Sequence, residues 1–324
     1  MKTRNNTIDV IRILACFSVI LCHIHFPGTI GRYCMALSRF AVPYFMMITG
    51  WYIYKENSDD MIKAIKRSLY SILKITIIST IFISIINTIV SLIEGKNAFD
   101  WFFSYWKEED LSTFILYNRA RFLSSVMWYL FAMIYVLLFY LIIVKFKLLK
   151  IIYWIIIPLI ILNLFRGEVL HKDWFYSGNW LFTGIPFTLI GTYMRSHDLW
   201  KKINNYIFGI FVLIGIFVTA IEVHNLSEIF FYIGTTPLAI GLFGWAMKND
   251  QLVWPKWLIS FGKNCTPKIF ILHCSLRDLI YAIFGTPNNI ILWLMPFCFF
   301  ALSGLVAIIL NILIKKINYL HKIA

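Results

Sequence analysis

Long apolar runs separated by short polar stretches follow one another along the whole chain. Several of them approach or exceed the ~18 to 20 residues that a helix needs to cross the hydrocarbon core of a bilayer. The pattern predicts ten spans, at residues 8–27, 34–54, 66–93, 122–145, 148–165, 179–195, 203–222, 228–247, 264–284 and 289–314. No separate soluble domain is visible, so we expect an all-α polytopic membrane protein with about ten transmembrane helices.

The composition agrees with this pattern and excludes one class of partner. The chain is 60% hydrophobic and only 14% charged, whereas an average soluble domain is about 25% charged. Its net charge of +14 would suit a nucleic-acid-binding protein, but the basic residues are spread over short loops and form no single stripe. We therefore expect the lipid bilayer, and no nucleic acid, as a partner.

The distribution of basic residues between the loops predicts an orientation. With the N-terminus in the cytoplasm, the cytoplasmic segments hold eighteen Lys and Arg residues and the outer segments hold eight. Cytoplasmic loops of membrane proteins carry such an excess of Lys and Arg. The bias favours an even number of spans, with both termini on the cytoplasmic side.

The first apolar segment carries ionisable residues, which are costly inside a membrane and by default indicate function. Arg12 and His23 are eleven residues apart, about three helical turns, so both project from one face roughly 16 Å apart. Asp9 precedes Arg12 by three residues, on the same side, and is expected to hold or neutralise it. The alternatives are that Arg12 extends to the cytoplasmic surface with Asp9 as its partner, and that His23 is a buried neutral residue bonded to a backbone carbonyl.

A second polar pair lies late in the chain. His273 and Arg277 are four residues apart and share one face of the ninth predicted span. They could bind a substrate or stabilise negative charge that develops on it, whereas the alternative pairs Arg277 with lipid phosphates or with Asp278. The adjacent pairs Cys22–His23 and His273–Cys274 have no ligand spacing and point to different faces, so we expect no metal ligands.

Four segments resemble the acyltransferase-3 family of bacterial integral-membrane acyltransferases, in the family's order. Residues Asp9, Arg12, Ala15, Val19 and His23 resemble its opening helix, where an Arg and a His stand ten residues apart. Three later segments agree: Arg39–Tyr52 with the second span, Met127–Leu130 with a W-[FY]-L element, and Phe270–His273 with a Y-x-x-H element. The resemblance extends to bacterial polysaccharide and cell-envelope O-acetyltransferases and to the membrane module of membrane-bound serine racemases. It covers essentially the whole length and implies one transmembrane domain over residues 1–324.

The resemblance implies a reaction and a location. Family members move an acyl group, often acetyl, from cytoplasmic acyl-CoA to a carbohydrate or other envelope acceptor at or beyond the outer face of the bacterial cytoplasmic membrane. Acyl-CoA is then the donor substrate, and no tightly bound cofactor is expected. Arg12, with Asp9, would bind a CoA phosphate through charge-assisted hydrogen bonds. His23 would act as general base on an acceptor hydroxyl, with direct acyl transfer to His23 as a variant.

The remaining site residues are assigned to the two substrates, with one departure from the family. The family often places an R-x-x-R pair at the cytoplasmic mouth of the third span, and here only the first cation, Arg67, is kept. Lys66, Lys63 or Lys74 could replace the second cation, and Arg67 and Lys66 are assigned to donor binding. The substrate-binding assignments are His273, Arg277, Trp128 and Tyr129.

A rival function comes from a different class of protein. The membrane module that precedes the racemase domain of membrane-bound serine racemases is thought to take up amino acids. A transporter or flippase for a small polar solute therefore remains an alternative. Dependence on acyl-CoA would distinguish the two functions.

Overall fold

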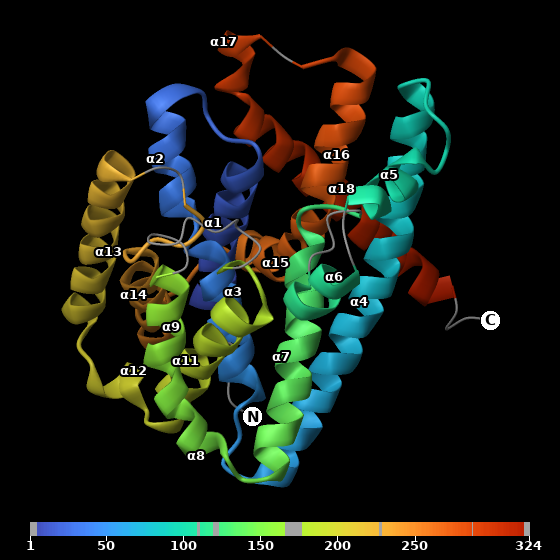
Figure 1. Ribbon diagram of the computed structural model, residues 1–324. Helices are drawn as coiled ribbons and strands as arrows, with labels where there is room; N and C mark the ends of the chain where they lie inside the picture. Colours follow the sequence, from blue (N-terminus) through green and yellow to red (C-terminus); the bar gives the residue numbers. More distant parts are fainter. Residues whose placement is uncertain are drawn as a thin grey trace.

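The computed structural model describes residues 5–108, 111–118, 123–165, 177–226, 229–286 and 288–320. These residues form helices and no strand, which confirms the predicted all-α class (Figure 1). The longer helices are α1 (Asn6–His23), α2 (Gly28–Ser38), α3 (Ala41–Ile53), α4 (Ser58–Ile93), α7 (Met127–Lys145), α11 (Ile185–Ser196), α13 (Asn205–Asn225), α14 (Thr235–Lys248), α16 (Thr266–Phe284) and α18 (Met295–Leu320). The shorter ones are α5 (Asp100–Glu108), α6 (Leu111–Tyr117), α8 (Leu149–Ile152), η1 (Tyr153–Ile155), α9 (Ile156–Leu164), η3 (Trp180–Gly184), α12 (Leu199–Lys202), α15 (Lys256–Asn264) and α17 (Asn289–Leu292).

Five helices are long and apolar enough, by length and composition, to cross a membrane: α1, α4, α7, α13 and the Met295–Lys316 part of α18. Several other predicted spans are interrupted. The segment 34–54 is divided between α2 and α3, 148–165 contains α8, η1 and α9, and 179–195 contains the π-helix η3 followed by α11. The protein is thus a multi-pass helical membrane protein, while the count of ten spans and the orientation stay predictions.

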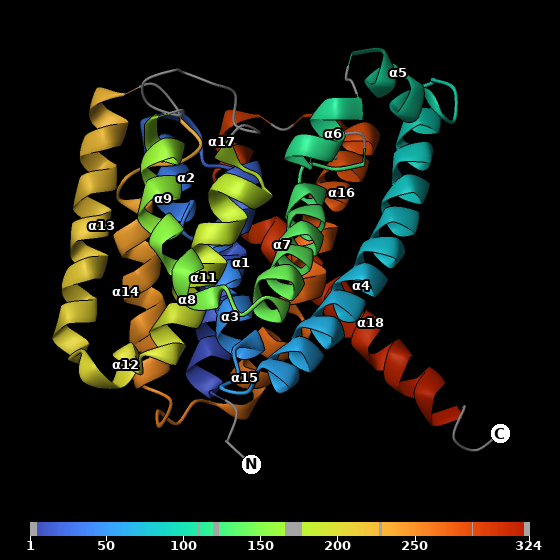
Figure 2. The same ribbon diagram turned by 60° about the horizontal axis from the view of Figure 1, so that its bottom comes forward.

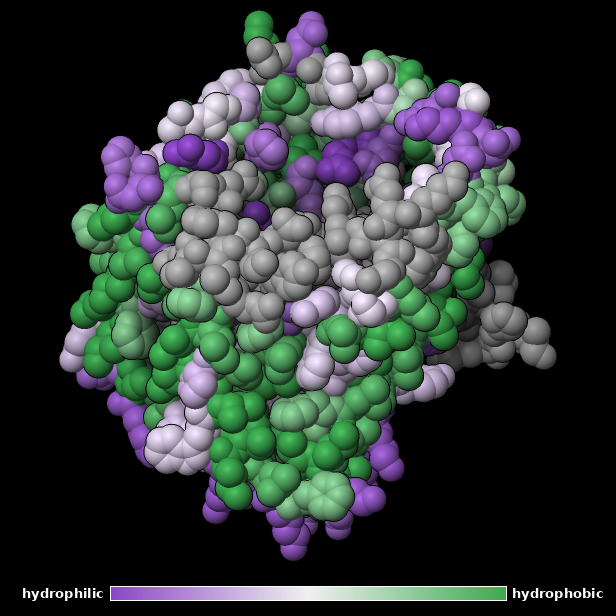
Figure 3. All heavy atoms as spheres, in the orientation of Figure 1, coloured by the Kyte–Doolittle hydropathy of each residue, from purple (hydrophilic) through white to green (hydrophobic). Residues whose placement is uncertain are grey.

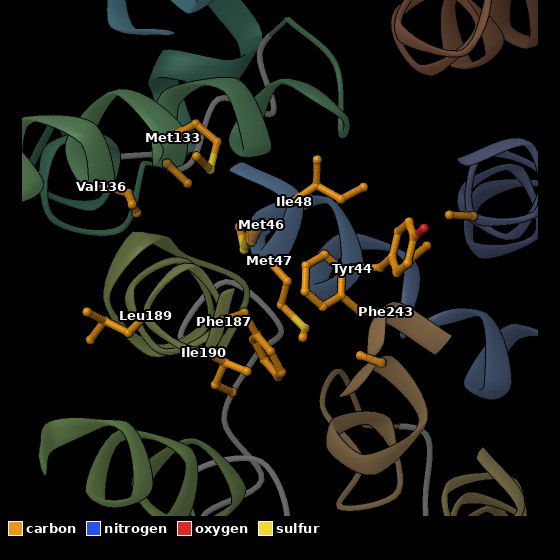
Figure 4. Close-up of a cluster of buried hydrophobic side chains, with 14 of the residues drawn as sticks. Tyr44, Met46, Met47, Ile48, Met133, Val136, Phe187, Leu189, Ile190 and Phe243 are labelled. Carbon is orange, nitrogen blue, oxygen red and sulfur yellow. The ribbon is translucent and has the colours of Figure 1, made fainter. Parts of the chain in front are cut away.

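Helix α3 lies at the centre of the main hydrophobic core. Figure 4 shows its Tyr44, Met46 and Met47 among side chains contributed by α7, α11 and α14. The backbones of α3 and α11 touch, because a Cβ atom on Gly191 would lie 2.1 Å from the Met47 carbonyl oxygen. Small residues permit this close approach of helices in membranes, where lipid removes the hydrophobic drive for association.

The other long helices form two flanks around this centre. Helices α13 and α14 pack together on one side, and α4, α7, α16 and α18 lie on the other (Figure 2). The outward faces of α4, α13 and α18 expose many large apolar side chains. Figure 3 shows hydrophobic side chains over much of the lower half of one face, with hydrophilic ones gathered at both ends of the molecule. This is the surface that a bilayer would cover.

Helix α1 is fixed at its first turn and ends at His23. The Asn5 side chain accepts a hydrogen bond from the Ile8 amide, capping the helix, and donates one to the Ala246 carbonyl over 2.9 Å. Asp9 in the first turn is favoured there by the positive end of the helix dipole. The helix ends four residues before the predicted boundary at residue 27, so His23 occupies its last turn.

Candidate functional site

The Asp9–Arg12 pair predicted from the sequence is present near the start of α1. The Arg12 Nη1 atom lies 2.9 Å from the Asp9 Oδ1 atom, and the two side chains are 19% and 1% exposed. The guanidinium is also close enough to Tyr44 of α3 and Tyr129 of α7 to act on both phenols electrostatically. Arg12 therefore lies near neighbouring helices. Its pairing with Asp9 fits both the donor site and the alternative in which Asp9 is the partner of a surface-reaching arginine, so the donor role stays a prediction.

His23, at the opposite end of α1, meets two other segments of the chain. Its Nδ1 atom lies 3.3 Å from the Ser125 Oγ atom, in the segment that leads into α7. Its backbone carbonyl accepts a hydrogen bond of 3.0 Å from Arg277 Nη1 of α16. Ser125 thus occupies Nδ1 and leaves Nε2 as the ring nitrogen open to a substrate. A serine hydroxyl can donate or accept, and Nε2 is the acceptor in the tautomer whose Nδ1–H donates to Ser125.

His273 of α16 faces His23, with ring centroids 5.3 Å apart. His273 is fully buried, and its Nδ1 atom lies 3.1 Å from the Ile269 carbonyl oxygen. Because a carbonyl only accepts, Nδ1 carries the proton in this bond, and Nε2 of the neutral ring is an acceptor. Within the described residues this Nε2 has no hydrogen-bond partner, so a buried acceptor stands beside His23.

Arg277 pairs with Asp278, as one alternative from the sequence had it, while its role toward the acceptor stays a prediction. Its Nε and Nη2 atoms bind Asp278 Oδ1 over 2.9 and 2.7 Å, while Nη1 reaches the His23 carbonyl. The four-residue spacing indeed puts His273 and Arg277 on one face, since both contact His23. The arginine therefore fixes the end of α1 directly.

A row of rings connects the two polar ends of the site. Tyr129 is hydrogen-bonded to Thr49 and stacks edge-on against Phe270, with centroids 5.2 Å apart. Phe270 in turn lies 6.4 Å from the His273 ring. Arg12 also acts electrostatically on Tyr129, so these rings lie between the Arg12 end and the His23 end of the site.

Trp128 lies beside Tyr129, with ring centroids 6.5 Å apart, but packs against a different partner. It is buried, and its ring packs edge-on against Phe230 at 5.9 Å. The Arg39 guanidinium lies over the same Phe230 ring at 4.9 Å and acts electrostatically on His23. Arg39, which the sequence offered only as the start of a motif, is thus a second cation near the proposed base.

Two predicted donor-binding residues are not brought to this site. Lys66 and Arg67 are exposed on α4. Among the residues that the structure describes, no hydrogen bond or ion pair joins either of them to Arg12. Their assignment to the donor stays a prediction without a contact that supports it.

Sequence reasoning missed Ser125, and it set Cys274 aside. The Ser125 Oγ atom lies 3.7 Å from the Cys274 Sγ atom as well as near His23. Ligand atoms of His23, His273 and Cys274 all lie within 4.8 Å of one another. The expectation that the neighbours His273 and Cys274 point to different faces is therefore wrong. The absence of a metal stays a prediction. No local signal indicates Ser125, because its partner His23 is 102 residues away.

Comparison with known proteins identifies the class. The family model of the acyltransferase domain matches residues 5–316, essentially the whole chain. The chain therefore belongs to the acyltransferase-3 family, as the four segments indicated, and is a membrane acyltransferase. No curated protein and no solved structure matches the chain.

Proposed function

We propose that this protein transfers an acetyl group from cytoplasmic acetyl-CoA to a hydroxyl group of an extracytoplasmic glycan or other envelope acceptor, in the bacterial cytoplasmic membrane. One observation carries the proposal. A single helix, α1, presents a buried Asp9–Arg12 pair near its start and a doubly anchored His23 at its end. Helices of this length span the hydrocarbon core, so a donor held at Arg12 and an acceptor at His23 could approach from opposite sides.

The proposed donor site is centred on Arg12. The guanidinium group of an arginine suits phosphate oxygens because it offers parallel N–H donors and stays protonated at physiological pH. Asp9 satisfies part of the guanidinium and fixes its direction. Among the residues that the structure describes, Nη2 and Nε have no hydrogen-bond partner, and they would bind a CoA phosphate. The pantetheine arm would then follow the row formed by Tyr129 and Phe270 toward His23.

The proposed chemistry takes place at His23. Its Nε2 atom accepts the proton of the acceptor hydroxyl as the hydroxyl oxygen attacks the thioester carbonyl. A C–O bond forms, and collapse of the tetrahedral intermediate breaks the C–S bond. The proton returns from the imidazolium to the departing CoA thiolate, so the reaction needs no oxidant or metal to balance. Arg277 and Arg39 both act electrostatically on His23, so these two cations would stabilise the developing oxyanion.

A reconstituted assay tests this function. Purified protein in proteoliposomes would receive radiolabelled acetyl-CoA on one side and an envelope glycan on the other, and the label on the glycan is measured. His23→Ala should abolish transfer, and His25→Ala, an exposed neighbour two residues on, should retain it. Accumulation of a solute inside the vesicles without any need for acetyl-CoA would support the transporter and overturn the proposal.

A further inference from the structure

A large cavity lies apart from the site described above. It has a volume of about 1220 Å³, larger than the roughly 300–1,000 Å³ of most small-molecule pockets. Its walls come from the α3–α4 turn, α4, α7, α8, η1, α9, α11, α12, α13 and α14, at the end of the bundle where the N-terminus lies (Figure 1). None of the lining residues belongs to α1 or α16, which carry Arg12, His23 and His273.

One end of this cavity is polar and basic. Lys55, Lys147 and Lys150 line it together with Ser58 and Ser196. Glu56 is the one carboxylate among the lining residues, so cations are in excess. Within the described part of the chain, Lys147 and Lys150 take part in no ion pair, and both are exposed. Their ammonium groups are available to an anion.

The rest of the cavity is apolar and is bounded by helices that face lipid. Ile156, Ile157 and Ile160 of α9 lie opposite Phe208 and Phe211 of α13. Both helices also expose apolar side chains that do not line the cavity, including Ile161 of α9, 58% exposed, and Leu213 of α13, 68% exposed. Such a lining suits a molecule with an anionic head and a hydrocarbon tail, because the charged part meets lysines and the tail avoids water.

We propose that this cavity binds an anionic phospholipid, with its phosphate at Lys147 and Lys150 and an acyl chain between α9 and α13. Acyl-CoA has similar chemistry, with phosphates and an acyl chain. However, a donor bound here would be separated from His23 by α3 and α11, which form the central core. The continuity of the apolar walls with the lipid-facing surfaces of α9 and α13 favours a membrane lipid.

Lipid retention by the full-length protein tests the proposal. The protein is purified in detergent, mixed with equal amounts of phosphatidylglycerol and phosphatidylcholine, and examined by native mass spectrometry. The wild type should retain one phosphatidylglycerol. The Lys147→Gln/Lys150→Gln variant should retain it about tenfold more weakly, since each lysine contributes to binding an anionic head group.

Two further variants make the result decisive. Lys256→Gln/Lys263→Gln removes the same charge from α15, outside the cavity, and should retain phosphatidylglycerol like the wild type. Ile160→Trp fills the apolar end and should release the lipid while leaving the lysines in place, which covers the case in which the double lysine variant does not fold. Equal retention by the cavity variants and the α15 control would overturn the proposal, as would displacement of the lipid by acetyl-CoA.

Discussion

Arg277 Nη1 donates a hydrogen bond of 3.0 Å to the backbone carbonyl of His23, while the other two nitrogens of the same guanidinium bind Asp278. The last carbonyls of a helix have no partner within it, and Arg277 satisfies one of them. A charged donor from α16 thereby fixes the residue that we propose as the general base. The interaction positions His23 and leaves its ring free for substrate.

Replacing Arg277 should therefore slow catalysis without weakening donor binding. A hydrogen bond to a charged group is worth about 1.5–3 kcal/mol, which corresponds to roughly a 10- to 100-fold loss in kcat. Arg277→Ala should show this loss, and Arg277→Lys should recover part of it because an ammonium can still reach the carbonyl. Steady-state kinetics at varied concentrations of acetyl-CoA measure kcat and the KM for acetyl-CoA. A rise in the KM for acetyl-CoA with unchanged kcat would assign Arg277 to the donor instead.

Ser125 should orient the His23 ring. Its hydroxyl lies 3.3 Å from Nδ1, and a neutral hydrogen bond contributes about 1 kcal/mol. Ser125→Ala should reduce kcat about fivefold, and Ser125→Thr, which keeps the hydroxyl, should stay near the wild-type rate. Measuring kcat of each variant as a function of pH shows whether the protonation of His23 has changed. If Ser125→Ala matched the wild type at every pH, the hydroxyl would have no part in positioning the ring.

The sequence predicts which residues belong to this site better than it predicts how they are brought together. Residue spacing within one helix is enough to pair Asp9 with Arg12 and to put His273 and Arg277 on one face, because helical geometry is local. The convergence of His23 with Ser125 and α16 depends on packing between segments more than 100 residues apart. No pattern along the chain carries that information.

Helix boundaries were the weaker part of the fold prediction, for a related reason. Hydropathy reports that a segment is apolar, and a protein interior is as apolar as lipid. It therefore gives one span for residues 34–54, where the structure has α2 and α3 with a break at Arg39 and Phe40. It likewise misses the π-helical turn Trp180–Gly184, which Asn179 caps by accepting from the Leu181 and Phe182 amides. Breaks of this kind depend on individual caps and contacts.

The close approach of α3 and α11 should make Gly191 intolerant of a methyl group. An added Cβ would lie 2.1 Å from the Met47 carbonyl oxygen, which is backbone and has little room to move. Overpacking of this kind costs about 1–3 kcal/mol, so Gly191→Ala should lower the Tm of the protein in detergent. Gly209→Ala provides the control, because nothing lies within 4 Å of its added Cβ. A Tm for Gly191→Ala equal to that of the control would mean that the two backbones separate easily.

Variants of the Asp9–Arg12 pair can separate the part of the Arg12 guanidinium in donor binding from its part in stability. Arg12→Gln removes the Arg12 ion pair from the Asp9 carboxylate, which is 1% exposed, and breaking a buried pair costs about 3–5 kcal/mol. The Asp9→Asn/Arg12→Gln variant removes both charges and should regain most of that stability in thermal unfolding. It should still have a KM for acetyl-CoA roughly 10- to 100-fold above wild type, because the phosphate has lost a charge-assisted hydrogen bond.

A donor without phosphates supplies the control for this last prediction. Acetyl-pantetheine offers the same thioester and arm but nothing for Arg12 to bind, so its KM should be the same for the wild type and the double variant. If Arg12 binds the donor, the double variant must raise the KM for acetyl-CoA and leave the KM for acetyl-pantetheine unchanged. Recovery of both stability and the KM for acetyl-CoA in the double variant would instead make the pair purely structural, and the donor would then have to be held by other cations at that end of the bundle.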